Sequence, residues 1–179
     1  RHKVEGMDIN VQYGTDISSG YLSLDYSATK LFDRSISDDT YGDVNYDCLG
    51  IFNGDCDNIV DYPVFDFKHR MTIGWSKDKW DLQLVWKYMS SLSDGDDSVD
   101  YFREELDAYS LVDLSGRYQL TDTITATIGI KNLFDNEPQP IGSNSWENFR
   151  DDNSIYSNTY TQYYDVFGRT MFIRFTGLF

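Results

Sequence analysis

The last twelve residues of the chain read GRTMFIRFTGLF (168–179), and their side chains alternate up to a C-terminal phenylalanine. In an extended strand the apolar and polar members fall on opposite faces, Met171, Ile173, Phe175 and Phe179 against Thr170, Arg174 and Thr176. Such a strand suits lipid on one side and water on the other, and it also suits a soluble sheet. The rest of the chain decides between them.

Six further segments show the same two-residue alternation. They span residues 7–13, 21–30, 65–76, 80–88, 112–120 and 124–131. The segment 80–88 is the clearest, because its tryptophans, leucines and tyrosine at even positions oppose Asp81, Gln83 and Lys87. The sequence therefore predicts an all-β protein with seven long strands.

The connections between these segments alternate in length. Those near 15–20, 77–79 and 121–123 are short, whereas 35–63, 94–108 and 135–163 are long. A meander that crosses a bilayer up and down has short turns on one side and long loops on the other, and a soluble sandwich has no reason to keep this rhythm. The pattern predicts an antiparallel transmembrane β-barrel. Seven strands with open edges in hydrocarbon are too few, so the chain is expected to be part of a larger barrel.

Composition excludes several classes. The formal charge of −15, from 30 acidic and 15 basic residues, disfavours nucleic acid as a partner. No run of eighteen apolar residues is present, so a membrane helix is not expected, and residues 1–5 do not begin a secretory signal. The abrupt start of the chain just before a strand suggests a fragment.

Several motifs occur together in an informative order. Asn132-Leu133-Phe134-Asp135 closes the penultimate strand, and after a long loop Tyr164-Asp165-Val166-Phe167-Gly168-Arg169 leads into the aromatic last strand. This combination resembles the C-terminal end of TonB-dependent outer-membrane receptors. The strand after 6–8, the turn at 120–122 and the loop 47–56 also look like that family. Gly177 departs from it, because the terminal strand often has a bulkier apolar residue there.

The resemblance implies a 22-stranded barrel with a separate plug domain, located in the outer membrane of a Gram-negative bacterium. Residues 1–179 would supply roughly the last seven strands, and the plug, the earlier strands and the TonB-contacting segment would lie outside this chain. The expected partners are the rest of the receptor, the TonB complex, outer-membrane lipid and the barrel-assembly machinery. Phe175 and Phe179 are assigned to the assembly signal.

Two motifs in the long connections suggest cross-linking or ion binding. Cys48 and Cys56, the only cysteines, lie in a polar loop, and at an oxidising cell surface we expect a disulfide rather than a metal site. The segment 94–105 has the oxygen spacing of a calcium loop, at Asp94, Asp96, Ser98, Asp100 and Glu105. Val99 stands where the sharp turn needs glycine, so a solvated acidic loop is the default interpretation.

The last long loop mixes aromatic and polar residues that can bind a polar ligand, or can simply pack on one another. The candidates are Trp146, Asn148, Phe149, Arg150, Tyr156 and Tyr160. Alternation alone assigns Asp66, Arg70, Lys87, Asp113, Arg117, Lys131 and Arg174 to the lumen and the plug contact.

The sequence predicts energy-coupled uptake of a scarce solute. An oligosaccharide is favoured because the acidic balance opposes anionic chelates, and a ferric siderophore comes next. A passive porin, a structural barrel and a soluble β-sandwich binding module remain alternatives. The two histidines form no catalytic constellation, so neither an enzyme nor a cofactor is expected.

Overall fold

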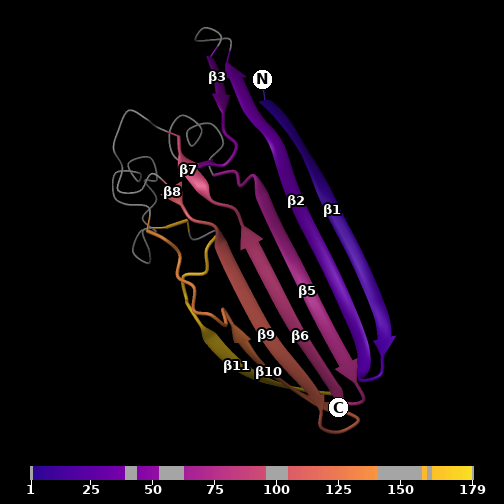
Figure 1. The fold of residues 1–179 in the computed structure, drawn as a ribbon. Helices are drawn as coiled ribbons and strands as arrows, with labels where there is room; N and C mark the ends of the chain where they lie inside the picture. Colours follow the sequence, from indigo (N-terminus) through magenta and orange to yellow (C-terminus); the bar gives the residue numbers. More distant parts are fainter. Residues whose placement is uncertain are drawn as a thin grey trace.

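A computed structural model describes residues 2–38, 44–52, 63–95, 105–140, 159–160 and 163–178. Seven long strands form one wall, β1 (His2–Ile17), β2 (Gly20–Asp38), β5 (Phe67–Lys77), β6 (Trp80–Met89), β9 (Tyr109–Gln119), β10 (Ile124–Lys131) and β11 (Thr170–Gly177). They lie side by side in chain order, and each pairs antiparallel with the next (Figure 1). The seven predicted strands and their meander order are confirmed.

Three tight turns connect strands at one end of the wall. They occupy 18–19, 78–79 and 120–123, and Asp78 adopts the left-handed conformation with φ of 52°. At the other end β2 leads to β5, β6 to β9 and β10 to β11 through the long connections. The predicted alternation of short and long connections is therefore present. Among the described residues no helix is long and apolar enough to cross a membrane.

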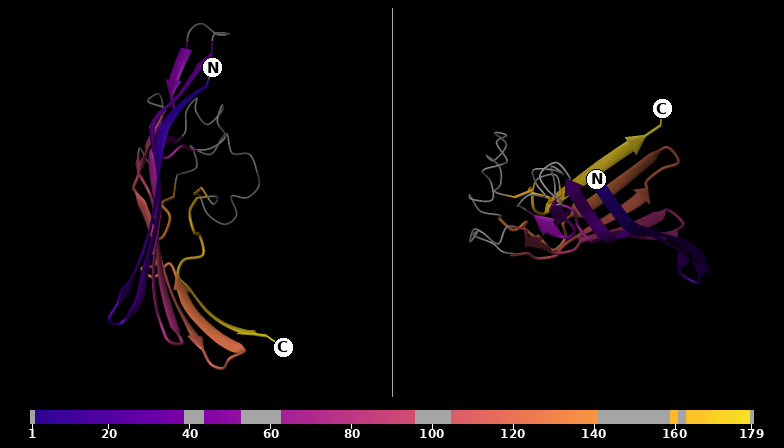
Figure 2. Two further views of the ribbon diagram at one scale, coloured as in Figure 1. Left: turned by 90° about the vertical axis from the view of Figure 1, so that its right-hand side faces the viewer. Right: turned by 90° about the horizontal axis from the view of Figure 1, so that it is seen from above.

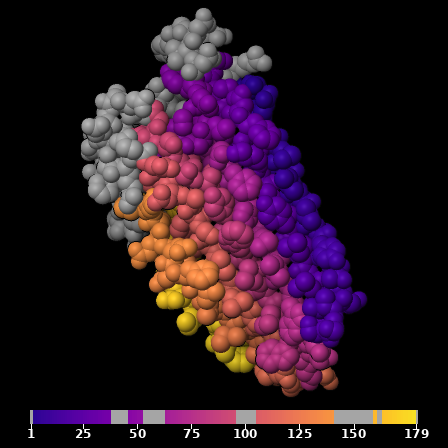
Figure 3. Space-filling model, in the orientation of Figure 1, coloured from indigo at the N-terminus to yellow at the C-terminus, as the bar shows by residue number. Residues whose placement is uncertain are grey.

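The wall is a single curved layer. Figure 2 shows β10 and β11 bending toward the same side as residues 163–169, which therefore lie on the concave side of the sheet. In Figure 3 the strands form a continuous surface from β1 to β11. We call the concave side the inner face and the opposite side the outer face.

Register assigns the alternating side chains to these two faces. On the outer face apolar residues lie opposite one another across the strands, as in the row Leu82, Gly116, Ile128 and Ile173. They are not in a core, because Leu82, Ile128 and Phe175 are 43%, 63% and 65% exposed. A soluble sandwich would bury this face against a second sheet, and exposed apolar area on this scale marks a surface made for an apolar partner.

Polar side chains occupy the inner face. Asp81 lies directly opposite Arg117 and accepts hydrogen bonds from its Nε at 3.0 Å and its Nη2 at 2.8 Å. Lys87 pairs diagonally with Asp113 at 3.2 Å. The pairing registers also place Arg70, Lys131 and Arg174 on this face, so the lumen assignment of these residues is consistent with the register.

Asp66 differs from the other residues assigned to the lumen. It precedes β5 and forms an ion pair with Lys30, whose register partner Phe67 belongs to the outer face. Burial alone would raise the pKa of this carboxyl, but hydrogen bonds from Lys30 and Ser90 outweigh it and hold the pKa below its usual value. The lumen assignment of Asp66 is therefore not supported, because alternation does not hold before the strand begins.

Four short strands were not predicted. β3 (Val44–Asp47) extends the wall by pairing with β2, and β4 (Ile51–Phe52), β7 (Leu92–Asp94) and β8 (Glu105–Leu106) form a separate three-stranded sheet. Each has two to four residues, which is too short to show a two-residue period in sequence.

The exposed outer face generates the first prediction. Replacing Leu84 by lysine, mid-strand on the outer face opposite Ile73 and Leu114, should destabilise the assembled barrel by about 2–4 kcal/mol, because a charge would enter hydrocarbon. Denaturant unfolding of the complete receptor in lipid vesicles measures this change. Gln83→Lys, one residue away on the inner face, is the matched control and should cost less than about 1 kcal/mol. Equal effects of the two substitutions would contradict the assignment of faces.

Candidate functional site

Residues from all three long connections meet in one apolar cluster at the loop end of the wall. We call it the loop core. Its buried members are Phe52, Phe65, Leu92, Leu106, Tyr109, Leu111, Tyr160 and Tyr164. Tyr109 and Leu111 belong to the inner face of β9, so the loop core packs against the inside of the wall. The connections are thereby held together against the inner face at the loop end of the wall.

The aromatic members of the loop core pack edge to face. The rings of Tyr109 and Tyr164 are 4.9 Å apart at 81°, and those of Phe65 and Tyr163 are 5.2 Å apart at 76°. Burial raises the pKa of Tyr164 to about 12, so its hydroxyl stays protonated at physiological pH. The Tyr109 hydroxyl lies 3.2 Å from the carbonyl oxygen of Asn136 and 3.4 Å from that of Asp165, which joins two loop segments.

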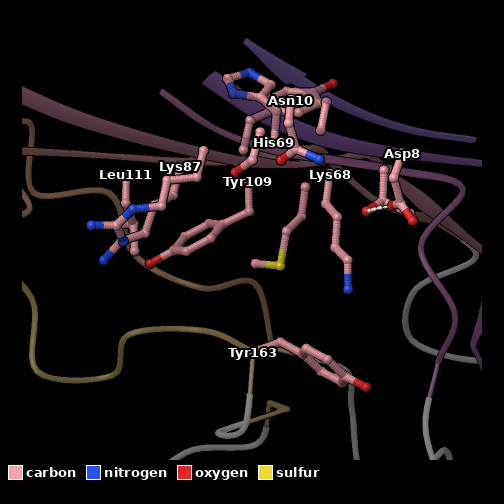
Figure 4. Close-up of a pocket in the computed structure, with 14 residues that line it drawn as sticks. Asp8, Asn10, Lys68, His69, Lys87, Tyr109, Leu111 and Tyr163 are labelled. Atoms are coloured by element: carbon pink, nitrogen blue, oxygen red, sulfur yellow. Dashed lines mark hydrogen bonds between the residues drawn. The ribbon is translucent and has the colours of Figure 1, made fainter. Parts of the chain in front are cut away.

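A hollow of about 550 Å³ lies directly beside the loop core on the inner face. Its polar lining comes from β1, β2, β5 and β6, with Asp8, Asn10, Ser27, Thr29, Lys68, Arg70 and Lys87. In Figure 4 the Lys68 side chain projects from the strands toward the side on which Tyr163 lies. The hollow therefore has charged side chains from the strands on one side and aromatic side chains on the other.

The charged lining of the hollow is cationic. The lining includes three positive side chains, Lys68, Arg70 and Lys87, and one carboxylate, Asp8, so its formal charge is +2. Asp8 accepts a hydrogen bond from the Thr29 hydroxyl at 2.7 Å, and Lys87 is paired with Asp113. Within the described part of the chain neither Lys68 nor Arg70 has an ion-pair partner. The hollow thus offers two free cations.

Sequence reasoning placed Arg70 and Lys87 in the lumen but did not bring them together with Lys68 and Tyr163. The signal was available in part, because Lys68 and Arg70 are two apart in one alternating strand. What the sequence lacked was the register that sets Arg70 directly opposite Lys87 and the fold of residue 163 back over both strands.

Tyr160 is the described member of the predicted ligand-binding loop. It is 3% exposed and packs in the loop core, so it has almost no surface with which to contact a ligand. The ligand role predicted for Tyr160 is therefore not what the structure shows. The other candidates, Trp146, Asn148, Phe149, Arg150 and Tyr156, lie outside the described residues.

The remaining site predictions are only partly covered by the described residues. Cys48 is buried and disulfide-bonded, but Cys56 lies outside the described residues, so its role as the partner stays a prediction. Of the calcium candidates, Asp94 belongs to β7 and Glu105 to β8, whereas Asp96, Ser98 and Asp100 lie outside the described residues. No group of three or more possible metal-ligating side chains occurs among the described residues. Phe179 is also outside, and Phe175 lies on the exposed outer face of β11.

Comparison with known proteins identifies the class. The family model described as TonB dependent receptor-like, beta-barrel matches residues 2–133. The chain therefore belongs to the TonB-dependent receptor-like β-barrel family. No match was found among curated proteins.

Solved structures show the same fold at low sequence identity. A variant of the ferric enterobactin receptor PfeA of Pseudomonas aeruginosa is 18% identical over 97% of this chain, with a TM-score of 0.61. The ferric-catecholate import receptor Fiu of E. coli K12 is 14% identical over 75% of this chain, with a TM-score of 0.51. The chain spans 22% of the length of the first of these receptors and 17% of the second.

The loop core yields the second prediction. Phe52→Ala removes a side chain with no exposed surface and should destabilise the loop core by about 3–5 kcal/mol, while the ladder of the wall is untouched. Hydrogen exchange of the complete receptor in detergent should show faster exchange at 92–94 and 105–106 but unchanged exchange in β5 and β6. Phe134→Ala, at a residue that is 66% exposed, is the matched control. Unchanged loop exchange in the Phe52 variant would rule out a shared core.

Proposed function

We propose that this chain is the C-terminal part of the barrel of an outer-membrane TonB-dependent receptor that takes up an anionic ferric siderophore. The family match supports the receptor class. The cationic hollow beneath the loop core supports the anionic substrate, and this observation carries the proposal.

The charge of the hollow favours an anion for a physical reason. The chain as a whole has a formal charge of −15, which would repel anions at long range, but screening at physiological salt limits that repulsion to about 8 Å. Inside the hollow the nearest charges dominate the interaction with a ligand. Two cations without ion-pair partners favour carboxylate, phenolate or other anionic oxygens. Tyr109 and Tyr163 add aromatic faces against which a flat ligand ring packs.

The oligosaccharide interpretation rested on the net charge and on a loop mostly outside the described residues. A neutral sugar has no charge that two unpaired cations could attract. None of the structures compared above is named as a saccharide receptor. The solved structures with this fold are named as receptors for ferric enterobactin and ferric catecholates, which agrees with an anionic chelate.

The same proposal assigns partners to the two faces. The outer face contacts outer-membrane lipid of a Gram-negative bacterium, and the inner face contacts a plug domain that lies outside this chain. TonB acts on a segment outside this chain, and the barrel-assembly machinery reads the terminal strand. A passive porin or structural barrel is the competing function, and it predicts uptake that is independent of TonB.

The third prediction tests the substrate class. In the complete receptor, Lys68→Gln combined with Arg70→Gln should weaken binding of a ferric siderophore about tenfold, because each charged contact contributes roughly 0.5–1 kcal/mol at a partly solvated site. Binding of the radiolabelled complex to iron-starved cells at 4 °C measures affinity, and uptake at 37 °C with and without TonB measures energy coupling.

Arg117→Gln is the matched control, because it removes an inner-face cation that does not line the hollow and already pairs with Asp81. Equal binding by the double variant and the parent would rule out the hollow as an anion site. Uptake that continues without TonB would support the porin instead.

A further inference from the structure

The connection between β10 and β11 cannot fix the register of these strands by its length. A two-residue hairpin turn sets register geometrically, but β10 ends at Lys131 and β11 begins only at Thr170. Within the described chain β11 pairs with β10 alone, so it has half the ladder of an internal strand. Yet Lys131 lies opposite Thr170, and the register continues without a break to Ile124 opposite Gly177. Some other contact has to select this pairing.

The turn that follows β10 is firmly attached to β9. Asn132, in the left-handed conformation with φ of 51°, accepts a hydrogen bond from the backbone N of Asn136 and donates one to its carbonyl oxygen, both at 2.9 Å. The Leu133 backbone N donates to the Val112 carbonyl at 2.7 Å, and the Asn136 amide donates to the Ser110 carbonyl at 2.7 Å. The turn is therefore a fixed point, which holds the side chain of Asp135 in one place.

From this fixed turn, Asp135 contacts Arg169, the residue just before β11. Its Oδ1 accepts a hydrogen bond from the backbone N of Arg169 at 2.7 Å, and its Oδ2 lies 3.5 Å from the Arg169 guanidinium. Gly168 has φ of 67°, and a Cβ at this residue would lie 3.2 Å from the same Oδ1. The chain therefore passes close to the carboxylate in a conformation that suits glycine.

We propose that Asp135 is a positioning residue that selects the register of the terminal strand by accepting the Arg169 backbone N–H. A slide of β11 by two residues keeps every side chain on its own face, so alternation does not oppose it. Such a slide moves the Arg169 N–H by about 6.8 Å, which breaks the hydrogen bond completely. Asp135 therefore discriminates between registers that the hydrophobic pattern leaves nearly equal.

The backbone hydrogen bond matters more than the charge. The side chains of Asp135 and Arg169 are 47% and 46% exposed, and an ion pair at such a site contributes little. A second contact supports the same register, because the Phe172 ring covers Gly129, where an added Cβ would lie 2.5 Å from two ring atoms. After a two-residue slide Phe172 would face Thr127 or Lys131 instead.

The experiment reads the register directly in the complete receptor, assembled in cells. A cysteine replaces Ile173, and a second replaces Ile128, which is its partner in this register, or Ala126 or Ile130, which are its partners after a two-residue slide either way. Oxidation in isolated outer membranes followed by a non-reducing gel gives the yield of each cross-link. In the parent, the Ile128 and Ile173 pair should dominate.

Asp135→Ala should lower the ratio of parent to slid cross-links about five- to tenfold, because the Arg169 backbone N–H loses its side-chain acceptor. Asp135→Asn keeps the acceptor oxygen and should retain most of the parent ratio, as should Arg169→Gln, which keeps the backbone N–H. Asp122→Ala, in the tight turn at the other end of β10, is the matched control.

An unchanged ratio in Asp135→Ala would overturn the proposal. If that variant does not assemble, Asp135→Asn decides: assembly in the parent register supports the proposal, and failure equal to that of alanine overturns it. This readout does not depend on which solute the receptor binds, so the register test and the substrate test fail separately.

Discussion

The backbone hydrogen-bond ladder is the constraint on which the rest of the structure depends. A strand in hydrocarbon has no water to satisfy its N–H and C=O groups, and each unsatisfied group costs several kcal/mol. The seven long strands meet this requirement by pairing each with the next without a break, from β1 to β11. Because the backbone N–H and C=O groups are paired between strands, the side chains on the two faces can contact two different solvents. The exposed outer face and the ion-paired inner face follow from that single condition.

A ladder satisfies the backbone in more than one register, so register needs its own determinants. At the tight turns the turn geometry supplies them. At each long connection a carboxylate near the strand ends contacts the neighbouring strand or the start of the next one. Asp66 precedes β5, pairs with Lys30 of β2, and its carbonyl accepts the Leu31 N–H at 2.8 Å. Asp113 of β9 pairs with Lys87 of β6, and Asp135 holds the start of β11. Part of the acidic composition therefore lies in contacts between strands, which net charge alone does not reveal.

The sequence predicted the wall well and the loop end poorly, and the reason is the range of the signals. Alternation is a property of neighbouring residues, so Trp80 to Tyr88 indicate their strand and their outward face without outside information. The loop core depends instead on residues such as Phe52, Leu106 and Tyr164, which come from three connections and have no common period. Tyr160 was assigned to a ligand for this reason, since an aromatic residue in a polar loop looks the same whether it binds a solute or a neighbouring loop. Alternation does not decide the side on which Asp66 lies, because this residue precedes the first residue of β5.

The loop core and the cationic hollow are two consequences of one packing arrangement. Tyr109 and Leu111 contribute to both, because each presents one side to the apolar cluster and lines the hollow with another. Tyr163 packs against the same buried cluster and lines the hollow together with Lys68 and Arg70. The short strands β4, β7 and β8, which sequence analysis did not find, contribute Phe52, Leu92 and Leu106 to the core that lies beside the hollow.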